Sequence, residues 1–271
     1  MSSISCLQLN MHHALLANVH LVEYLVVEHS IAFITEPYTA FGKIVATPSG
    51  YSVFPHLTCT PPPRAGLLVP SAFQPVFLET LSSRDLVVAQ VSFAQHTYVL
   101  ASFYSDITSD FFQPCLQTLI DFVNQHDYRL IFCADTNAHS TLLGDCDNNS
   151  RGDEFEEFVL RNSLYVENVG TTPTFETVRG DSLLTSFIDA TLTLNVPNLV
   201  DWHVSRDQNY SDHNNIHFRI LDQVDIYKET RNWKTIRWDI FAERLESLPT
   251  LPEYMTKHKI CLLYTSDAAD E

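Results

Sequence analysis

The chain has 271 residues, 45% of them hydrophobic, which is enough to fill the core of one large α/β domain or two small ones. No apolar run approaches the length of a membrane span, and residues 1–13 lack the basic start and apolar stretch of a secretory signal. A formal net charge of −17 opposes binding to nucleic-acid phosphates, so any DNA affinity of this chain alone should be weak and strongly salt-dependent.

Short runs with strand character alternate with helical stretches over the first 220 residues. A strand at 4–10 is followed by a helix at 14–28, whose apolar residues recur at roughly helical spacing, and by a strand at 31–37 that stops at Pro37. The remaining predicted elements are strands at 51–54, 65–70, 85–93 and 97–104, a helix at 111–125, a strand at 129–135, a helix at 151–162, and strands at 185–194, 198–204 and 213–220.

The order of these elements predicts the fold class. Strands 85–93 and 97–104 are separated only by the residues AQH and should form a hairpin, whereas helices separate other strands. Antiparallel hairpins mixed with crossover helices predict two sheets packed face to face with helices outside. The expected fold is α/β (α+β), a four-layer α/β/β/α sandwich of two mostly antiparallel mixed sheets with outer helices.

The character of the sequence changes after residue 221, so one domain is predicted over residues 1–221. Residues 222–259 are charged, carry a short amphipathic stretch, and are interpreted as a linker toward a downstream module. Residues 260–271 resemble a translated adapter sequence and are set aside from the fold. The native protein is therefore expected to be longer than this chain.

The six cysteines show no CxxC pair and no Cys/His spacing, which argues against structural zinc and a disulfide scaffold. The chemistry is instead suggested by acidic, amide and imidazole groups that stand where apolar strands begin or end. Strand ends that share one edge of a layered fold converge on one crevice. Mg²⁺ prefers oxygen ligands, and cleavage of a phosphodiester needs a metal, a positioned water and a proton source. Each residue alone is more commonly a turn or surface group, but together they predict a metal-assisted phosphodiesterase site formed by Asn10, Glu36, Asp135, Asn137, Asp189, Asp212 and His213.

Seven segments in this order resemble the endonuclease/exonuclease/phosphatase superfamily and, within it, the endonuclease domain of non-LTR retrotransposons. The resemblance covers nearly all of residues 4–220, and its most specific segment is ADTNAHSTLLG (134–144), a D-x-N strand end followed by a turn particular to the retrotransposon branch. One departure is YSDI (104–107), where the family often has a proline soon after the tyrosine. The other matching segments are LQLN (7–10), TEPY (35–38), SFYSD (102–106), TPTF (172–175), SFID (186–189) and SDHNNI (211–216).

The resemblance implies a metal site and an imidazole pair. Glu36 would ligate Mg²⁺, with Mn²⁺ as the alternative ion, while Asn10 and Asp212 would support the metal and its waters. His213 would stabilise the charge of the phosphate or relay a proton, and Asp189 would hold its imidazole in the working tautomer.

The resemblance also implies the groups that handle the water and the phosphate. Asp135 would orient or deprotonate the attacking water, and Asn137 would contact the scissile phosphate. Tyr104 would donate to a phosphate oxygen, and Thr174 and Ser211 would help to shape the phosphate pocket.

The leading hypothesis is therefore a DNA endonuclease that leaves a 3′-hydroxyl, which in the family primes reverse transcription. Its expected partners are DNA and, only in the full-length protein, element RNA and a reverse transcriptase module; it would act in the nucleus after cytoplasmic synthesis, without a membrane. Two alternatives stay open: another phosphoesterase of the superfamily (phosphatase, sphingomyelinase or deadenylase) and a non-catalytic DNA-targeting remnant. The surface loops at 56–64 and 176–185 carry no readable target code, and Arg64 is the first position to test for a DNA contact.

Overall fold

The computed structural model divides the chain into two units, Met1–Ile226 and Tyr227–Glu271, and all described residues belong to the first. The predicted tail (260–271) and the predicted linker (222–259), apart from its first residue, lie outside the described part of the chain. The described residues are 3–45, 47–55, 60–111, 113–180 and 182–222.

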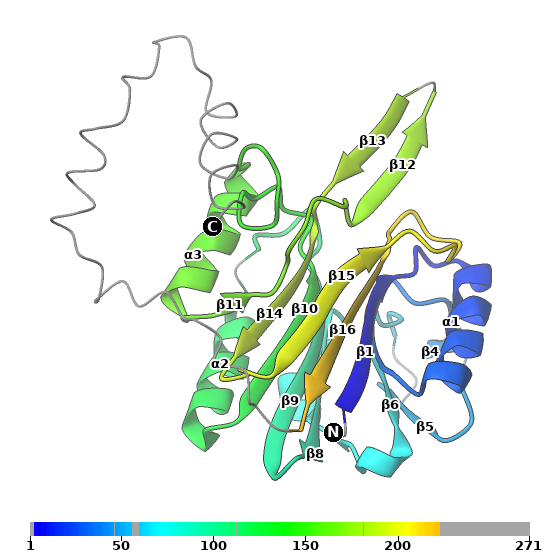
Figure 1. The fold of residues 1–271 in the computed structure, drawn as a ribbon, viewed down its shortest axis with the longest axis vertical. Helices are drawn as coiled ribbons and strands as arrows, with labels where there is room; N and C mark the ends of the chain where they lie inside the picture. The colour runs from blue at the N-terminus through cyan, green and yellow to red at the C-terminus, as the bar shows by residue number, and fades with distance from the viewer. Residues whose placement is uncertain (1–2, 46, 56–59, 112, 181, 223–271) are drawn as a thin grey trace, which may run out of the picture. The chain divides into compact units, whose positions relative to one another are not determined.

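Two six-stranded sheets form the body of this unit (Figure 1). Each is mostly antiparallel and contains one parallel pair, β1–β2 in the first sheet and β9–β10 in the second. The first sheet has the order β15-β16-β1-β2-β6-β5, with β15 at Leu199–Ser205, β16 at Asn215–Leu221, β1 at Ser3–Asn10, β2 at Ile31–Thr35, β6 at Ala65–Pro70 and β5 at Tyr51–Phe54. The second has the order β11-β14-β10-β9-β8-β7, with β11 at Tyr165–Val166, β14 at Asp189–Leu194, β10 at Arg129–Asp135, β9 at His96–Tyr104, β8 at Leu86–Phe93 and β7 at Val76–Phe77.

Side-chain alternation along β10 shows how the second sheet is buried on both faces. Ile131 and Cys133 pack into the core between the two sheets, whereas Leu130, Phe132 and Ala134 pack against helices on the other side. Successive residues of a strand point to opposite faces, so an unbroken apolar run such as RLIFCA indicates a strand covered on both sides.

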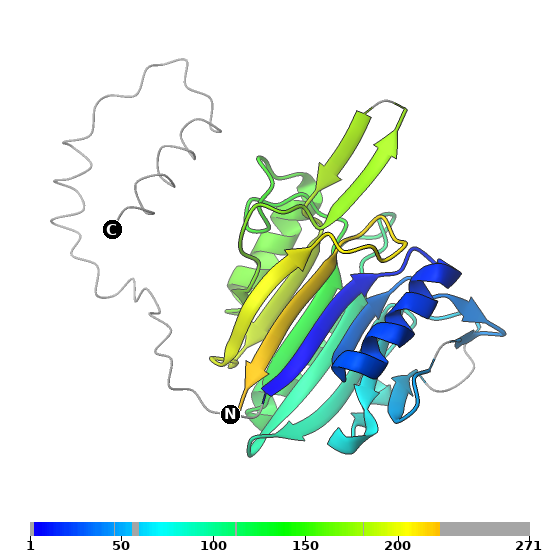
Figure 2. The ribbon, with the colours of Figure 1, turned by 45° about the vertical axis from the view of Figure 1, so that its right-hand side comes forward.

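The first sheet is covered in the same way. From β1, Ile4 and Cys6 point into the core between the sheets, while Leu7 and Leu9 pack against Leu21 of helix α1, Leu15–Glu28. Helices α2, Pro114–His126, and α3, Ser150–Arg161, lie on the outside of the second sheet, and Figure 2 shows α1 in front of one sheet and α3 behind the other. The predicted four-layer sandwich is confirmed. No helix in the described ranges is long and apolar enough to cross a membrane.

The helices begin and end where local chemistry dictates. Proline at the first position opens α2, where no intrahelical bond from its nitrogen is required. The Asn149 side chain caps α3 by accepting from the backbone N–H of Gly152 at 2.7 Å. Helix α2 ends at Asp127, which adopts the left-handed conformation.

One predicted strand, 185–194, is in fact two. Its first part belongs to β13, Ser182–Ser186, which pairs with β12, Phe175–Arg179, as a hairpin that projects from the sandwich (Figures 1 and 2). The strand is interrupted at Phe187 and Ile188 before β14 begins. This hairpin occupies the residues where a surface loop was expected, 176–185, and β12 also bridges to the segment before β16 through Phe175 and His213.

The structure adds four short elements that the sequence pattern does not reveal. They are β3 at Thr39–Ala40, β4 at Lys43–Ile44, and two 3₁₀ helices, η1 at Ser71–Phe73 and η2 at Glu79–Leu81; the two-residue strands β7 and β11 are also absent from the predicted elements.

Candidate active site

Strand register brings the predicted polar side chains to one edge of the sandwich. In the second sheet, Asp135 at the end of β10 is opposite both Tyr104 at the end of β9 and Asp189 at the start of β14. In the first sheet, Asn10 ends β1 beside the end of β2, and Glu36 follows β2 directly. The carboxyl ends of the two parallel pairs therefore meet at the same place, as the sequence predicted.

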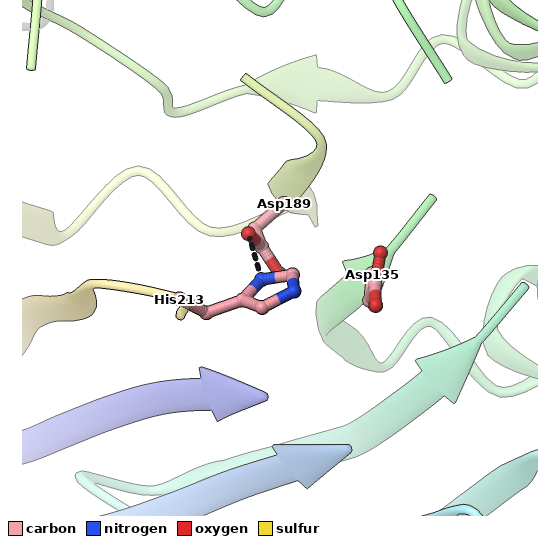
Figure 3. A group of neighbouring side chains, drawn as sticks. All are labelled: Asp135, Asp189 and His213. Carbon is pink, nitrogen blue, oxygen red and sulfur yellow. Dashed lines mark hydrogen bonds and ion pairs between the residues drawn. The ribbon is translucent and has the colours of Figure 1, made fainter. Parts of the chain in front are cut away.

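Asp135, Asp189 and His213 form a buried cluster at this edge (Figure 3). The Nδ1 atom of His213 lies 2.8 Å from Oδ2 of Asp189, and the other ring nitrogen lies on the side of Asp135 in Figure 3. One ligand atom from each of the three residues falls within 4.8 Å of the others.

The electrostatics of this cluster raise the pKa values of both Asp135 and His213. Burial and the nearby charge of Asp189 raise the pKa of Asp135 to about 7. Burial lowers the pKa of His213, but the carboxylates of Asp189, Asp135 and Asp212 outweigh it and raise that pKa to about 9. At neutral pH the imidazole is therefore charged while Asp135 is close to its midpoint.

Asn10 links the cluster to a second set of oxygen ligands. Its Nδ2 donates to Oε2 of Glu36 at 3.2 Å and to Oδ2 of Asp135 at 2.8 Å, and its Oδ1 accepts from the backbone N–H of His12. The Oδ1 atom of Asp212 is buried and accepts no hydrogen bond, although Nδ1 of His12 lies 3.3 Å away. A buried carboxylate oxygen that accepts no hydrogen bond is a ligand of the kind that a hard divalent cation prefers.

Glu36 and Asn137 both adopt positive φ angles, 45° and 49°. Left-handed backbone is tolerated by asparagine but is costly for glutamate, and such conformations are retained at functional sites. The backbone of Glu36 is held by its N–H, which donates to the carbonyl of Arg64 at 2.8 Å, and by its carbonyl, which accepts from His13 at 2.8 Å.

Tyr104 faces this edge beneath an arginine. The guanidinium of Arg64 lies 4.8 Å from the Tyr104 ring and bonds to both carboxylate oxygens of Asp85, at 2.6 and 2.7 Å, and to Asp106. Arg64, the sequence candidate for a DNA contact, therefore has its charge engaged by two carboxylates. Burial and then the charge of Glu36 raise the pKa of the Tyr104 hydroxyl, which stays protonated and able to donate.

Asn137 is positioned by residues that the sequence analysis did not single out. Its Nδ2 donates to the carbonyl of Ser105 at 3.0 Å, and its backbone N–H donates to Oδ1 of Asp135 at 3.2 Å. Arg151 of α3 binds the hydroxyl of Ser105 and the carbonyl of Thr136. No local pattern marks Ser105 or Arg151, because their partners come from other segments of the chain.

Thr174 and Ser211, expected in the phosphate pocket, hold the backbone around the cluster. The hydroxyl of Thr174 is fully buried and accepts from the N–H groups of Ile188 and Asp189, both at 3.1 Å. The Ser211 hydroxyl donates to the carbonyl of Asn10 at 2.8 Å and accepts from the N–H of His213 at 3.2 Å. In this structure both side chains brace the site.

Comparison with known proteins agrees with this fold. The family model described as endonuclease-reverse transcriptase matches residues 98–217. The endonuclease domain of TRAS1, a telomere-specific non-LTR retrotransposon, has a similar structure with a TM-score of 0.68 and 26% identity, covering 82% of this chain and 100% of that domain. No curated protein matches the chain.

Two more distant structures share the fold. The AP endonuclease LMAP from Leishmania major has a TM-score of 0.60 at 11% identity, with 80% of this chain and 87% of that chain covered. The D. rerio protein TDP2, complexed with a single-strand DNA product, has a TM-score of 0.53 at 14% identity, with 82% of this chain and 100% of that chain covered.

The fold is similar to that of a retrotransposon endonuclease domain, and the endonuclease-reverse transcriptase model matches part of the chain. The predicted resemblance to the endonuclease/exonuclease/phosphatase superfamily and, within it, to the endonuclease domains of non-LTR retrotransposons is therefore confirmed.

Proposed function

We propose that this chain is a metal-dependent DNA endonuclease that hydrolyses a phosphodiester to leave a 3′-hydroxyl, and that the nick serves the insertion of a retrotransposon. The observation that carries the proposal is the buried Asp135–Asp189–His213 cluster, placed beside oxygen ligands on a fold shared with the TRAS1 endonuclease domain. Such a cluster combines a base near its midpoint, a proton carrier and the carboxylate that orients it.

Asp135 is suited to orient and deprotonate the attacking water. A general base works best when its pKa lies near the working pH, and burial brings this carboxylate to about 7. The side chain of Asn10 and the backbone N–H of Asn137 each bind one of its oxygens, so the carboxylate cannot rotate freely.

His213 is suited to stabilise the negative charge that develops on the phosphate. Its Nδ1 is bonded to Asp189, which fixes the ring and leaves Nε2 as the group that meets the substrate. Because the imidazole is charged at neutral pH, Nε2 carries a proton for the phosphate or for the leaving oxygen.

Glu36, Asn10 and Asp212 would hold Mg²⁺, or Mn²⁺ in its place. The buried Oδ1 of Asp212, which accepts no hydrogen bond, supports this set. The alternative group of Asp135, Asp189 and His213 is less suitable for a hard cation, since one carboxylate oxygen is taken by the imidazole and one ligand is nitrogen. When bound, the metal supplies neutralisation of the phosphate charge.

Two neutral donors would complete phosphate binding. The Tyr104 hydroxyl remains protonated, and the Asn137 side chain is fixed through the Ser105 carbonyl. Tyr104 ends β9 and Asn137 follows the neighbouring parallel strand β10, so they would reach the phosphate from the same side.

The choice of product follows from the proposed role. A reverse transcriptase extends a 3′-hydroxyl, and the matched family pairs an endonuclease with a reverse transcriptase. The partners would be target DNA and, in the full-length protein, element RNA and the reverse transcriptase module, with action in the nucleus.

Nicking of supercoiled plasmid in Mg²⁺ or in EDTA tests the proposal. Wild type should produce open circles only with the metal, and Asp135→Ala and His213→Ala should each slow nicking by at least about 10²-fold. Exposed residues on α2 provide matched controls, Asp121→Ala and His126→Ala, which should nick like wild type. A DNA polymerase should extend the nicked product without phosphatase treatment.

Two outcomes would count against the proposal. Hydrolysis of a lipid or sugar phosphate without any nicking would favour another phosphoesterase of the superfamily. DNA binding without metal-dependent hydrolysis, unaffected by Asp135→Ala, would favour the non-catalytic remnant.

A further inference from the structure

The candidate active site is divided between the two sheets. Asn10 ends β1 of the first sheet and His213 lies two residues before β16 of the same sheet, whereas their partners Asp135 and Asp189 belong to the second. The two hydrogen bonds that join them, both 2.8 Å long, therefore cross the gap between the sheets. Such bonds tolerate a displacement of only a few tenths of an ångström.

Apolar packing alone does not fix how one sheet lies on the other. Most of the core between the sheets consists of aliphatic and aromatic side chains, whose attraction is not directional. When core residues are replaced by other hydrophobic residues of the same total volume and pattern, the protein still folds, but it loses its single well-defined packing arrangement before it loses stability. A site built across the gap thus requires directional contacts close to it.

Gln8 supplies those contacts. It lies two residues before Asn10 on β1, so its side chain points to the same side, toward the second sheet. Its Nε2 donates to the carbonyl oxygens of Ala134 at 3.3 Å and Ala190 at 3.2 Å, and its Oε1 accepts from the hydroxyl of Thr191 at 2.8 Å. All the hydrogen-bonding groups of this buried amide are thus directed at the second sheet.

The residues that Gln8 binds are the immediate neighbours of the catalytic carboxylates. Ala134 directly precedes Asp135 in β10, and Ala190 directly follows Asp189 in β14. A single side chain therefore holds both carboxylate-bearing strands at the point where each meets the site.

Two further buried bonds reinforce the same layer. The indole N–H of Trp202, in the first sheet, donates to the hydroxyl of Thr191 at 2.9 Å. The hydroxyl of Ser102, in the second sheet, donates to the carbonyl of Ile34, two residues before Glu36, at 2.9 Å. Connected polar groups in a low-dielectric interior strengthen one another and favour one arrangement.

We propose that Gln8 is a positioning residue that fixes how the two sheets lie against each other. It thereby fixes the distances from Asn10 to Asp135 and from His213 to Asp189. Its catalytic consequence rests on the proposed nuclease function. Its structural consequence does not, because the His213–Asp189 hydrogen bond is present without any substrate.

The main test compares Gln8→Met with a polar bond between the sheets that lies far from the site. Tyr98→Phe is the matched control: the Tyr98 hydroxyl bonds to Asn198 at 2.9 Å, and Tyr98 lies six residues before Tyr104 on β9, about 20 Å away along the strand. Gln8→Met should lower kcat for plasmid nicking by about 10- to 100-fold with KM within about threefold, since misplacement by about 1 Å can cost 10²-fold. Tyr98→Phe should lower Tm yet keep kcat within about threefold.

A second variant removes the Gln8–Thr191 contact from both sides. In Gln8→Met/Thr191→Val the hydroxyl is removed together with its partner, but the indole N–H of Trp202 loses its acceptor, so Tm should stay close to that of Gln8→Met while kcat stays low. Recovery of kcat together with Tm would overturn the proposal, as would a single Gln8→Met variant that nicks like wild type. If Gln8→Met does not fold, the double variant carries the same comparison.

A spectroscopic measurement keeps the proposal independent of activity. The Nδ1 proton of His213 bonded to Asp189 should give a low-field NMR resonance that is absent in His213→Ala. The resonance should be lost or shifted in Gln8→Met and in the double variant, and kept in Tyr98→Phe. If wild type does not nick DNA but this pattern holds, the nuclease proposal fails and the positioning role stands; a resonance unchanged in Gln8→Met would refute the positioning role.

Discussion

Gly152 lies in the first turn of α3, where this helix meets the loop after Asp135, and its replacement by alanine tests how tightly the two are packed. A Cβ at this position would lie 1.9 Å from the carbonyl oxygen of His139, whereas ordinary contacts begin near 3.4 Å. The obstacle is backbone, so the helix or the loop must move by roughly 1.5 Å. That loop carries Asn137, so the movement should also disturb the site.

The expected effect of Gly152→Ala is the balance of two opposing terms. Alanine in a helix is worth about 1 kcal/mol over glycine, whereas overpacking against a rigid neighbour costs about 1–3 kcal/mol or more. The clash is severe, so we expect a net loss of about 2 kcal/mol, which lowers the melting temperature of a domain of this size by roughly 4–8 °C.

Thermal melting followed by circular dichroism measures this effect. The control is Leu160→Ala on the same helix, because Leu160 is 74% exposed and its truncation should leave the melting temperature within about 2 °C. Nicking by Gly152→Ala should fall at least about tenfold. A variant that melts at or above the wild-type temperature would show that α3 does not approach the loop as closely as described.

Three other changes test the burial and charges of the described residues. Asp135→Asn should abolish nicking yet stabilise the protein in EDTA at pH 8. Burial raises the pKa of this carboxylate to about 7, so its ionisation destabilises the fold as pH rises from about 4 to 7, by at most about 4 kcal/mol, and the higher stability of the variant should vanish near pH 4. Equal melting temperatures of variant and wild type at pH 8 would contradict this reasoning. Asp189→Asn should slow nicking by about 10²- to 10⁴-fold and lower the melting temperature near pH 7, because His213 loses the carboxylate that fixes its tautomer and stabilises its buried charge, and rates within fivefold of wild type would exclude that role. Phe111→Ala should cost about 3–5 kcal/mol in urea unfolding because Phe111 is fully buried, whereas Phe41→Ala, 97% exposed, should cost almost nothing.

The long elements follow from sequence because burial imposes a period on them. The apolar run 129–135 and the helical spacing of 14–28 match β10 and α1 within one residue at each end. The hairpin of β12 and β13 was not foreseen, since Val178, Leu183 and Leu184 are largely exposed and no buried face sets a pattern. Strands of two residues, such as β3 and β4, are too short to show any period.

The residues of the candidate site could be proposed from the sequence, but the residues that position them could not. Asp135, Asn137 and His213 stand at strand ends in an order that a motif can capture. Gln8 and Arg151 act through carbonyl and hydroxyl groups far away in the chain, 126 residues away for the bond from Gln8 to Ala134. Such contacts exist only once the sheets have assembled, so no local spacing encodes them.

The pairing of β1 with β16 bears on how the protein becomes active during synthesis. Ser3 is opposite Leu221, so the first strand keeps an open edge until the last strand of the domain has been made. Contacts this distant in sequence form late, and an open edge can pair wrongly in the meantime. His213, two residues before this final strand, also joins the candidate site last. A nascent chain therefore holds no complete candidate site until residues 213–221 have left the ribosome.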